Sequence, residues 1–167
     1  MVQETLKVAA ICTGNICRSP MAEVLLQHLV AQDESLSDRV SVTSAGTARW
    51  HVGSPMDSRA RGALDRAGFY GPGSVGAYAD TTYLDAQDLV IVMTREHLDD
   101  VRSRLRNDET EVLLWRNITE PGLNLDVADP YYGDDQEFDE CLASLKPGGQ
   151  RLTSVFRQRL DERCRGA

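Results

Sequence analysis

Residues 12–20 (CTGNICRSP) are the feature of this sequence that most constrains its fold. They follow a short apolar run at 8–11, which is typical of a buried strand, and they lead into a helix-like run at 21–26. Gly14 and Asn15 favour the tight backbone conformations of a turn between a strand and a helix. Backbone N–H groups converge in such a turn, so the segment is predicted to bind an oxyanion.

A thiol and a guanidinium stand at the two ends of this predicted turn. The thiol of Cys12 would lie at the bottom of the N–H cradle, where peptide dipoles, a helix N-terminus and a nearby arginine all lower the pKa of a cysteine. The planar guanidinium of Arg18 can hold two oxygens of a phosphate at once. Phosphoryl transfer requires an in-line nucleophile and donors around three equatorial oxygens. We therefore expect a phosphate-binding loop made of Cys12, Thr13, Gly14, Asn15, Ile16, Cys17, Arg18 and Ser19.

Alternating strand and helix patterns predict a single α/β domain over residues 1–167. Apolar runs predict strands at about 7–11, 40–43, 89–93 and 111–115. Helical spacing and capping residues predict helices at about 20–32, from Ser54, after Thr94, from Asp134, and over 152–160. The expected architecture is a central, twisted, four-stranded parallel sheet with helices on both faces. Ligands bind at the carboxyl ends of such strands, and the candidate positions that follow strands are Cys12, Ser44, Thr94 and the segment that holds Asp129.

Composition limits the class of partner and of site. The chain carries a net charge of −8 and no basic stripe, which argues against a nucleic-acid partner. Its first apolar run is too short for a signal peptide or a membrane segment, so we expect a cytoplasmic protein without membrane attachment. The four cysteines lack the spacing of a disulfide scaffold or a zinc site. No metal or cofactor is expected, and ordinary packing or surface roles are expected for His28, His51 and His97.

Three segments of this sequence resemble the low-molecular-weight protein tyrosine phosphatase family. Residues 12–20 resemble the family signature, 129–133 (DPYYG) resemble its general-acid loop, and 44–47 (SAGT) resemble the segment after its second strand. The nine-residue form of the first motif is a specific match, and the resemblance covers essentially the whole chain. It implies a metal-independent enzyme that hydrolyses phosphotyrosine and aryl phosphates.

The resemblance also implies a role for each residue of the expected site. Cys12 would form a phosphocysteine intermediate, Arg18 would bind the phosphate, and Asp129 would act as general acid and then as general base. Expulsion of a phenoxide needs an acid in any case, and only the Asp-Pro-Tyr-Tyr match favours Asp129 over the neighbouring Asp126. In relatives a cysteine at the position of Cys17 can close a disulfide that protects the nucleophile from irreversible oxidation.

Three aromatic residues, Trp50, Tyr131 and Tyr132, lie in loops at the predicted active end. Aromatic residues most often pack in the core, but this position favours the walls of a cleft that a phenyl ring can enter. Such a cleft would let phosphotyrosine reach Cys12 and leave phosphoserine short. The resemblance implies that Trp50 lines the cleft and that the two tyrosines can be phosphorylated. The expected partners are therefore a phosphotyrosine protein substrate and a tyrosine kinase.

Support for the phosphate-binding loop is expected from Asn15, Ser19 and Ser44. The resemblance implies that Asn15 and Ser44 brace the loop from behind. Ser19 is expected to cap the following helix, and a hydrogen bond from its hydroxyl to the sulfur of Cys12 is the second possibility. Many members of the family carry a histidine that supports the loop. None occurs in 73–78 (GSVGAY), so the bracing network is expected to differ here.

Two other functions stay open from the sequence alone. A thioredoxin-coupled arsenate reductase can share this fold and loop, but it needs two further cysteines near the third strand. The segment 70–115 has none, and Cys141 and Cys164 are poorly placed for that relay. A phosphate-binding module that captures without cleaving is the other alternative, and an acid loop would serve no purpose in it.

Overall fold

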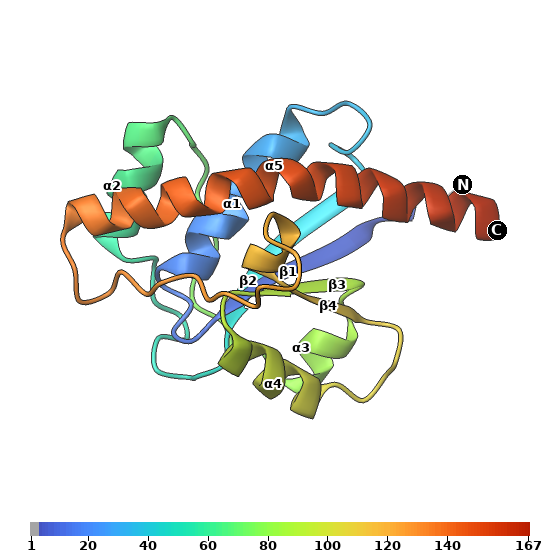
Figure 1. Cartoon of the computed structure of the whole chain (residues 1–167), viewed down its shortest axis with the longest axis horizontal. Helices are drawn as coiled ribbons and strands as arrows, with labels where there is room; N and C mark the ends of the chain where they lie inside the picture. Colours follow the sequence, from blue (N-terminus) through green and yellow to red (C-terminus); the bar gives the residue numbers. More distant parts are fainter. Residues whose placement is uncertain (1–3) are drawn as a thin grey trace.

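One parallel sheet of four strands organises the computed structural model, which describes residues 4–167. The strands lie in the order β2-β1-β3-β4, with β1 and β3 in the middle (Figure 1). Their bounds are Leu6–Cys12 for β1, Val40–Gly46 for β2, Leu89–Val92 for β3 and Glu111–Leu114 for β4. The predicted fold class is confirmed, and the predicted strands differ from the observed ones only at their ends.

Helices cover both faces of this sheet (Figure 1). One face packs against α1 (Arg18–Ala31), α2 (Ser58–Ala67) and α5 (Asp135–Gly166), and the other against α3 (Thr81–Asp85) and α4 (Arg95–Arg104); a 3-10 turn, η1 (Trp115–Ile118), follows β4. Alternate residues of β1 enter the two cores: Val8 belongs to the first core and Ala9 to the second. A strand buried on both faces must be apolar throughout, which explains the composition of the run at 8–11.

The last helix corrects an expectation, because α5 is one helix of 32 residues where two were predicted over 134–160. Pro147 lies inside α5 without ending it. At Gly148 an added Cβ would come within 2.5 Å of Trp115 Nε1, so glycine is what allows the helix to pack against η1. This packing outweighs the poor helix propensity of proline and glycine. Neither α5 nor any other helix in residues 4–167 is both long and apolar enough to cross a membrane.

The start of α2 also differs from the prediction. The helix begins at Ser58 rather than just after Ser54, because the carboxylate of Asp57 caps it by accepting the N–H of Arg59. The predicted cap of α4 is confirmed, since the hydroxyl of Thr94 accepts the N–H of His97. The short helix α3 was not predicted. It follows the glycine-rich segment 70–80, which contains no helix and only an isolated bridge to β2.

Candidate active site

A cleft of about 710 Å³, counted to its open mouth, lies where β1 ends. Its lining comprises Cys12, Thr13, Gly14, Ile16, Cys17, Arg18, Trp50, His51, Asp129, Tyr131 and Tyr132. The structure thus brings the predicted nucleophile, phosphate ligand, acid and aromatic walls into one cavity. His51 was not predicted to be there; its position next to Trp50 in the sequence was the available signal.

Hydrogen bonds from neighbouring segments hold the backbone of the phosphate-binding loop. Four of its carbonyls accept hydrogen bonds from outside the loop, with N···O distances of 2.9–3.1 Å. Because C=O and the following N–H point in opposite directions in a trans peptide, these bonds direct the next N–H groups away from the donors. Asn15 has a φ of 58°, the left-handed turn expected of it. The four bonds run from Thr47 to Cys12, Ala48 to Thr13, Asp57 to Ile16, and Met21 to Cys17.

Ser19 does not cap α1, which corrects one of its two expected roles. The helix begins two residues before Pro20, and its N-cap is Cys17, without a side-chain hydrogen bond. The side chain of Ser19 turns instead to Cys12, with its Oγ 2.9 Å from the sulfur. Because the same Oγ accepts a hydrogen bond of 2.8 Å from Asn15 Nδ2, the hydroxyl proton of Ser19 is free to point at the sulfur. Ser19 is therefore placed to contact the sulfur of Cys12 directly.

A buried chain of hydrogen bonds continues behind the loop. The amide of Asn15 donates to Ser44 Oγ (3.0 Å) and accepts the N–H of Ala77 (2.9 Å). Ser44 in turn donates to Glu23 Oε2 at 2.7 Å, and the hydroxyl of Ser74 donates to the other oxygen of Glu23. Ser74 comes from the segment in which the family's histidine is missing, so a serine closes the network here.

Glu23 was not predicted, although it is fully buried, with 0% of its surface exposed. The available signal in the sequence was its place between two apolar residues, Ala22 and Val24, in the predicted first helix. A buried carboxylate is costly unless it is hydrogen-bonded. Three side chains satisfy this one by donating to it, those of Ser44, Ser74 and Gln27.

Arg18 is buried beside the predicted acid. Its Nη1 donates to the carbonyl of Val127 (3.1 Å), and its Nη2 lies 3.4 Å from Asp129 Oδ2. The side chain of Asp129 is 48% exposed and lines the cleft. The rival Asp126 is not among the described residues that line the cleft, and the N–H of Arg95 holds the pKa of its carboxyl below the usual range. The geometry therefore favours Asp129 as the proton donor.

A buried histidine contacts the loop from the side of α4. His97 Nε2 lies 2.7 Å from Thr13 Oγ1. Burial, together with the charge of Arg18, lowers the pKa of His97 to about 4, so its ring is neutral at physiological pH. Its Nδ1 has no hydrogen-bond partner within residues 4–167. This contact joins two elements far apart in the chain, which is why the sequence suggested only an ordinary role for His97.

The three predicted wall residues are exposed around the mouth of the cleft. Trp50 is 77% exposed, Tyr132 95% and Tyr131 39%. The rings of Tyr131 and Tyr132 meet edge to face, with centroids 5.0 Å apart. This exposure excludes packing in the core, which was the alternative for these residues. We refer to Trp50, Tyr131 and Tyr132 together as the aromatic rim.

All four cysteines are unpaired, and the three besides Cys12 lie in different surroundings. Burial raises the pKa of Cys17 far above its ordinary value and that of Cys141 to about 12. Cys141 lies behind the acid loop, with its sulfur 3.9 Å from the carbonyl of Ala128, and Cys164 is exposed near the far end of α5. Neither lines the cleft in the part of the chain described. This arrangement does not suit a disulfide relay from Cys12 to the surface.

A family model described as low molecular weight phosphotyrosine protein phosphatase matches residues 7–164. The chain belongs to this family. Low molecular weight protein-tyrosine phosphatase A of Mycobacterium tuberculosis is 42% identical over 147 residues, or 87% of this chain and 88% of that protein. A low molecular weight protein-tyrosine-phosphatase of Streptomyces coelicolor is 35% identical over 164 residues, which cover 96% of this chain and 99% of the relative.

Solved structures related to this phosphatase family share its fold. The crystal structure of YfkJ from Bacillus subtilis superimposes with a TM-score of 0.82 at 28% identity, covering 95% of this chain and 99% of that one. The YwlE arginine phosphatase from Geobacillus stearothermophilus gives a TM-score of 0.80 at 26% identity, covering 94% and 96%. Because this second neighbour is named as an arginine phosphatase, the substrate of the present chain must be argued from its own cleft.

Proposed function

We propose that this chain hydrolyses phosphotyrosine in proteins, and aryl phosphates, through a phosphocysteine intermediate on Cys12. The observation that carries the proposal is the meeting of Cys12, Arg18 and Asp129 in one cleft bordered by the aromatic rim. Family membership supports hydrolysis of a phosphate ester. The aromatic rim supports a phenyl ring as the group next to the phosphate, since stacked aromatic rings attract one another.

In the first step the thiolate of Cys12 attacks phosphorus, so that an S–P bond forms as the P–O bond to the phenol breaks. The loop N–H groups and the guanidinium of Arg18 hold the three equatorial oxygens. Asp129, protonated in this step, gives its proton to the departing oxygen, so phenol leaves rather than phenoxide. Asp129 is suited to this role by its position, because its half-exposed side chain lines the same cleft as Cys12.

In the second step a water molecule attacks the phosphocysteine. Asp129, now a carboxylate, takes a proton from the water as the new P–O bond forms and the S–P bond breaks. The sulfur of Cys12 departs as a thiolate, and the hydroxyl of Ser19, 2.9 Å away, stabilises the charge that develops on it. Phosphate is released, and the thiolate is ready for another turnover.

The cleft also supports a choice among phosphorylated residues. Cys12 is buried while the aromatic rim is exposed, so a phosphate reaches the sulfur only on a side chain long enough to pass the rim. Phosphotyrosine fits this description better than phosphoserine. The high exposure of Tyr132 supports its modification by a tyrosine kinase. The need for a reduced Cys12 supports a cytoplasmic location.

Stopped-flow measurement with p-nitrophenyl phosphate tests this proposal against its alternatives. We expect release of the phenol and of phosphate without added metal or thiol, and faster hydrolysis of phosphotyrosine peptides than of phosphoserine or phosphoarginine peptides. Thiol-dependent reduction of arsenate without ester hydrolysis would establish a reductase instead. Tight binding of phosphate without any turnover would establish a binding module. Preferential hydrolysis of phosphoarginine would overturn the assignment of the substrate.

A further inference from the structure

An arginine at the start of α2 contacts the acid loop. Arg59 forms a bidentate ion pair with Asp57, in which its Nε and Nη2 lie 3.0 and 2.9 Å from the two carboxylate oxygens. Its remaining terminal nitrogen, Nη1, donates a hydrogen bond of 2.8 Å to the carbonyl of Gly133. Gly133 closes the turn of the acid loop, because its N–H binds the carbonyl of Pro130 at 2.8 Å. The guanidinium therefore holds a carboxylate on one edge and the acid loop on another.

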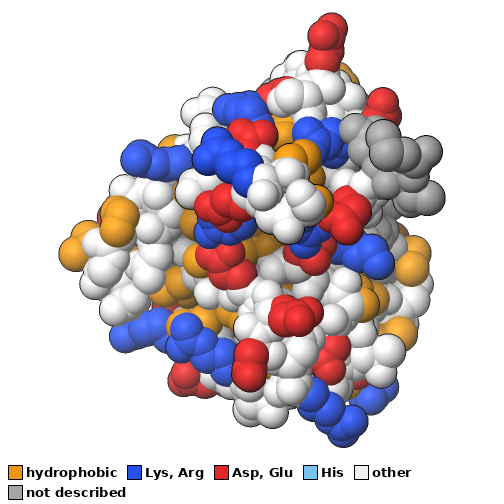
Figure 2. Space-filling model, turned by 90° about the vertical axis from the view of Figure 1, so that its right-hand side faces the viewer, with side chains coloured by type: hydrophobic (Ala, Val, Ile, Leu, Met, Phe, Trp, Pro, Cys, Tyr) orange, Lys and Arg blue, Asp and Glu red, His pale blue; other side chains and the backbone are white. Residues whose placement is uncertain are grey.

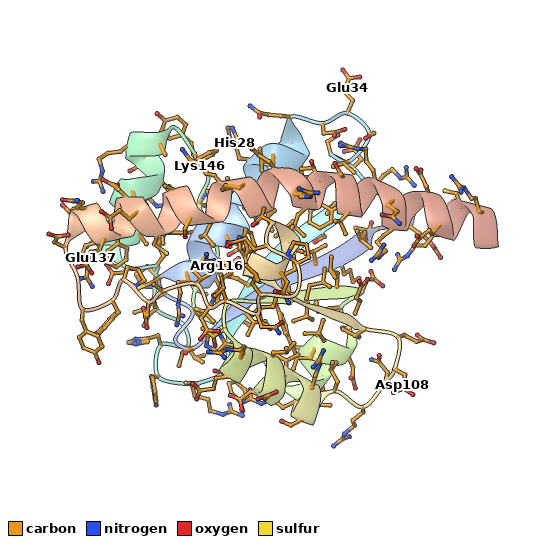
Figure 3. The ribbon with its side chains drawn as sticks, viewed as in Figure 1. His28, Glu34, Asp108, Arg116, Glu137 and Lys146 are labelled. Atoms are coloured by element: carbon orange, nitrogen blue, oxygen red, sulfur yellow. The ribbon has the colours of Figure 1, made fainter. Side chains whose placement is uncertain are left out.

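The same guanidinium packs on two aromatic rings beside the acid loop. Its central carbon lies 4.5 Å from the centroid of Phe138, in the first turn of α5, and 5.7 Å from that of Tyr131. Glu137, labelled in Figure 3 at the beginning of α5, lies so close to Gly133 that a side chain at position 133 would collide with it. The end of the acid loop is thus packed between Arg59 and the start of α5.

Asp57, the partner of Arg59, is tied to the phosphate-binding loop. Its N–H donates to the carbonyl of Ile16 at 2.9 Å, while its carboxylate caps α2 and holds Arg59. A continuous path of contacts therefore runs from Ile16 through Asp57 and Arg59 to Gly133. This path joins the loop that holds the nucleophile to the loop that holds the acid.

A second arginine on α2 shows what an ordinary surface pair looks like in this molecule. Arg66 pairs with Asp139 of α5 at 2.7 Å, and both side chains are about half exposed. Arg66 bonds to neither of the two active-site loops in the described structure. The contacts of Arg59 with Gly133 and Tyr131 are what distinguish the two arginines.

We propose that Arg59 is a positioning residue that holds the acid loop, and with it Asp129, at the distance from the phosphate-binding loop that protonation of the leaving group requires. The inference rests on the proposed function of Asp129. It has a specific kinetic consequence. Loss of Arg59 slows departure of a poor leaving group, which needs the proton, more than departure of a good leaving group, which does not.

The test compares Arg59→Met, Arg59→Lys and the matched control Arg66→Met with phenyl phosphate and p-nitrophenyl phosphate as substrates. For Arg59→Met we expect kcat/KM to fall about tenfold with phenyl phosphate, a fraction of the effect of removing a general acid. With p-nitrophenyl phosphate the same variant should fall by less than about threefold, because its leaving group needs less help. Lysine should restore part of the activity, since it keeps one donor, and Arg66→Met should behave like the parent.

Two further measurements keep the inference separate from folding and from the proposed function. Circular dichroism and thermal melting of each variant establish that the fold is intact. In an Asp129→Ala background, Arg59→Met should no longer change kcat/KM for phenyl phosphate, because no acid remains to be positioned. Equal losses with both substrates, or an undiminished loss in that background, would overturn the role of Arg59 while leaving the proposed function standing. Failure of the parent to hydrolyse either ester would instead overturn the proposed function.

Discussion

Charged side chains are arranged differently at the two ends of the sheet: they form surface ion pairs at one end and are buried beside the cleft at the other. At the amino ends of the strands, acidic and basic side chains pair on the surface, as with Arg163 and Asp88 or Arg159 and Glu111. Figure 2 shows this interspersed pattern on the face that the viewer sees. At the carboxyl ends, Arg18 and Glu23 are buried, and the cleft is open beside them.

The exposed ion pairs at the amino ends stabilise the fold, whereas the buried residues at the carboxyl ends hold the cleft in the shape that a ligand needs. A partly exposed ion pair contributes about 0–1 kcal/mol, and its loss leaves both partners in water. A buried polar group that loses its partner costs about 1–3 kcal/mol, so burial at the carboxyl ends constrains each of these residues to one arrangement. Substitutions of the residues that line or brace the cleft at the carboxyl ends should therefore change activity, whereas substitutions at the amino ends should change stability slightly.

The largest effect is expected at Cys12. Cys12→Ser should abolish turnover of aryl phosphates, because a serine hydroxyl in this cradle is a far weaker nucleophile than a thiolate. Release of phenol measures the activity, and circular dichroism with binding of inorganic phosphate measures the fold and the cradle. Residual turnover near the parent rate in this variant would contradict the role of the sulfur.

The next effect is expected at the acid loop. Asp129→Ala should lower kcat/KM for phenyl phosphate by about 10²–10⁴, the usual contribution of a general acid. Asp126→Ala is the matched control, since Asp126 accepts the N–H of Arg95 at the start of α4 and is not among the described residues that line the cleft. If the two variants exchanged these outcomes, Asp126 would be the acid.

The stability of the protein should depend on pH through His97, the buried histidine at the carboxyl ends of the strands. The folded state lowers the pKa of His97 from 6.5 to about 4, so between these values the unfolded chain binds a proton that the folded chain excludes. The free energy of unfolding should fall as pH falls from about 6.5 to about 4, with a contribution from His97 of at most about 3 kcal/mol. Urea unfolding of the parent and of His97→Gln at several pH values measures it. Parallel curves would refute the burial of a neutral ring.

The smallest effect is expected at the amino ends. Arg163→Ala should lower the free energy of unfolding by about 0–1 kcal/mol, because it removes a partly exposed ion pair with Asp88. Its kcat/KM should equal that of the parent, and its loss of stability should shrink in high salt. A tenfold loss of activity in this variant would break the contrast between the two ends.

Contiguous motifs made the centre of the site predictable from sequence. Residues 12–19 are contiguous, so their types and spacing alone predicted the phosphate-binding loop. The aromatic rim was predicted because its three residues lie in loops at the carboxyl ends of the strands. Contacts between distant elements were not predictable: no local pattern joins Ser74 to Glu23 or Thr13 to His97. The two helices expected in place of α5 show the same limit, because close packing at Gly148 overrides the local propensity to break the helix.

Because α5 is long, it places one exposed thiol far from the cleft. The helix begins at the acid loop and carries Cys164 roughly 44 Å farther along its axis, where that thiol is exposed while the other three cysteines are buried. With inorganic phosphate shielding Cys12, a maleimide reagent should attach a dye or a solid support at Cys164. Protein immobilised in this way would present its catalytic mouth to the solution, free for large phosphorylated partners to approach.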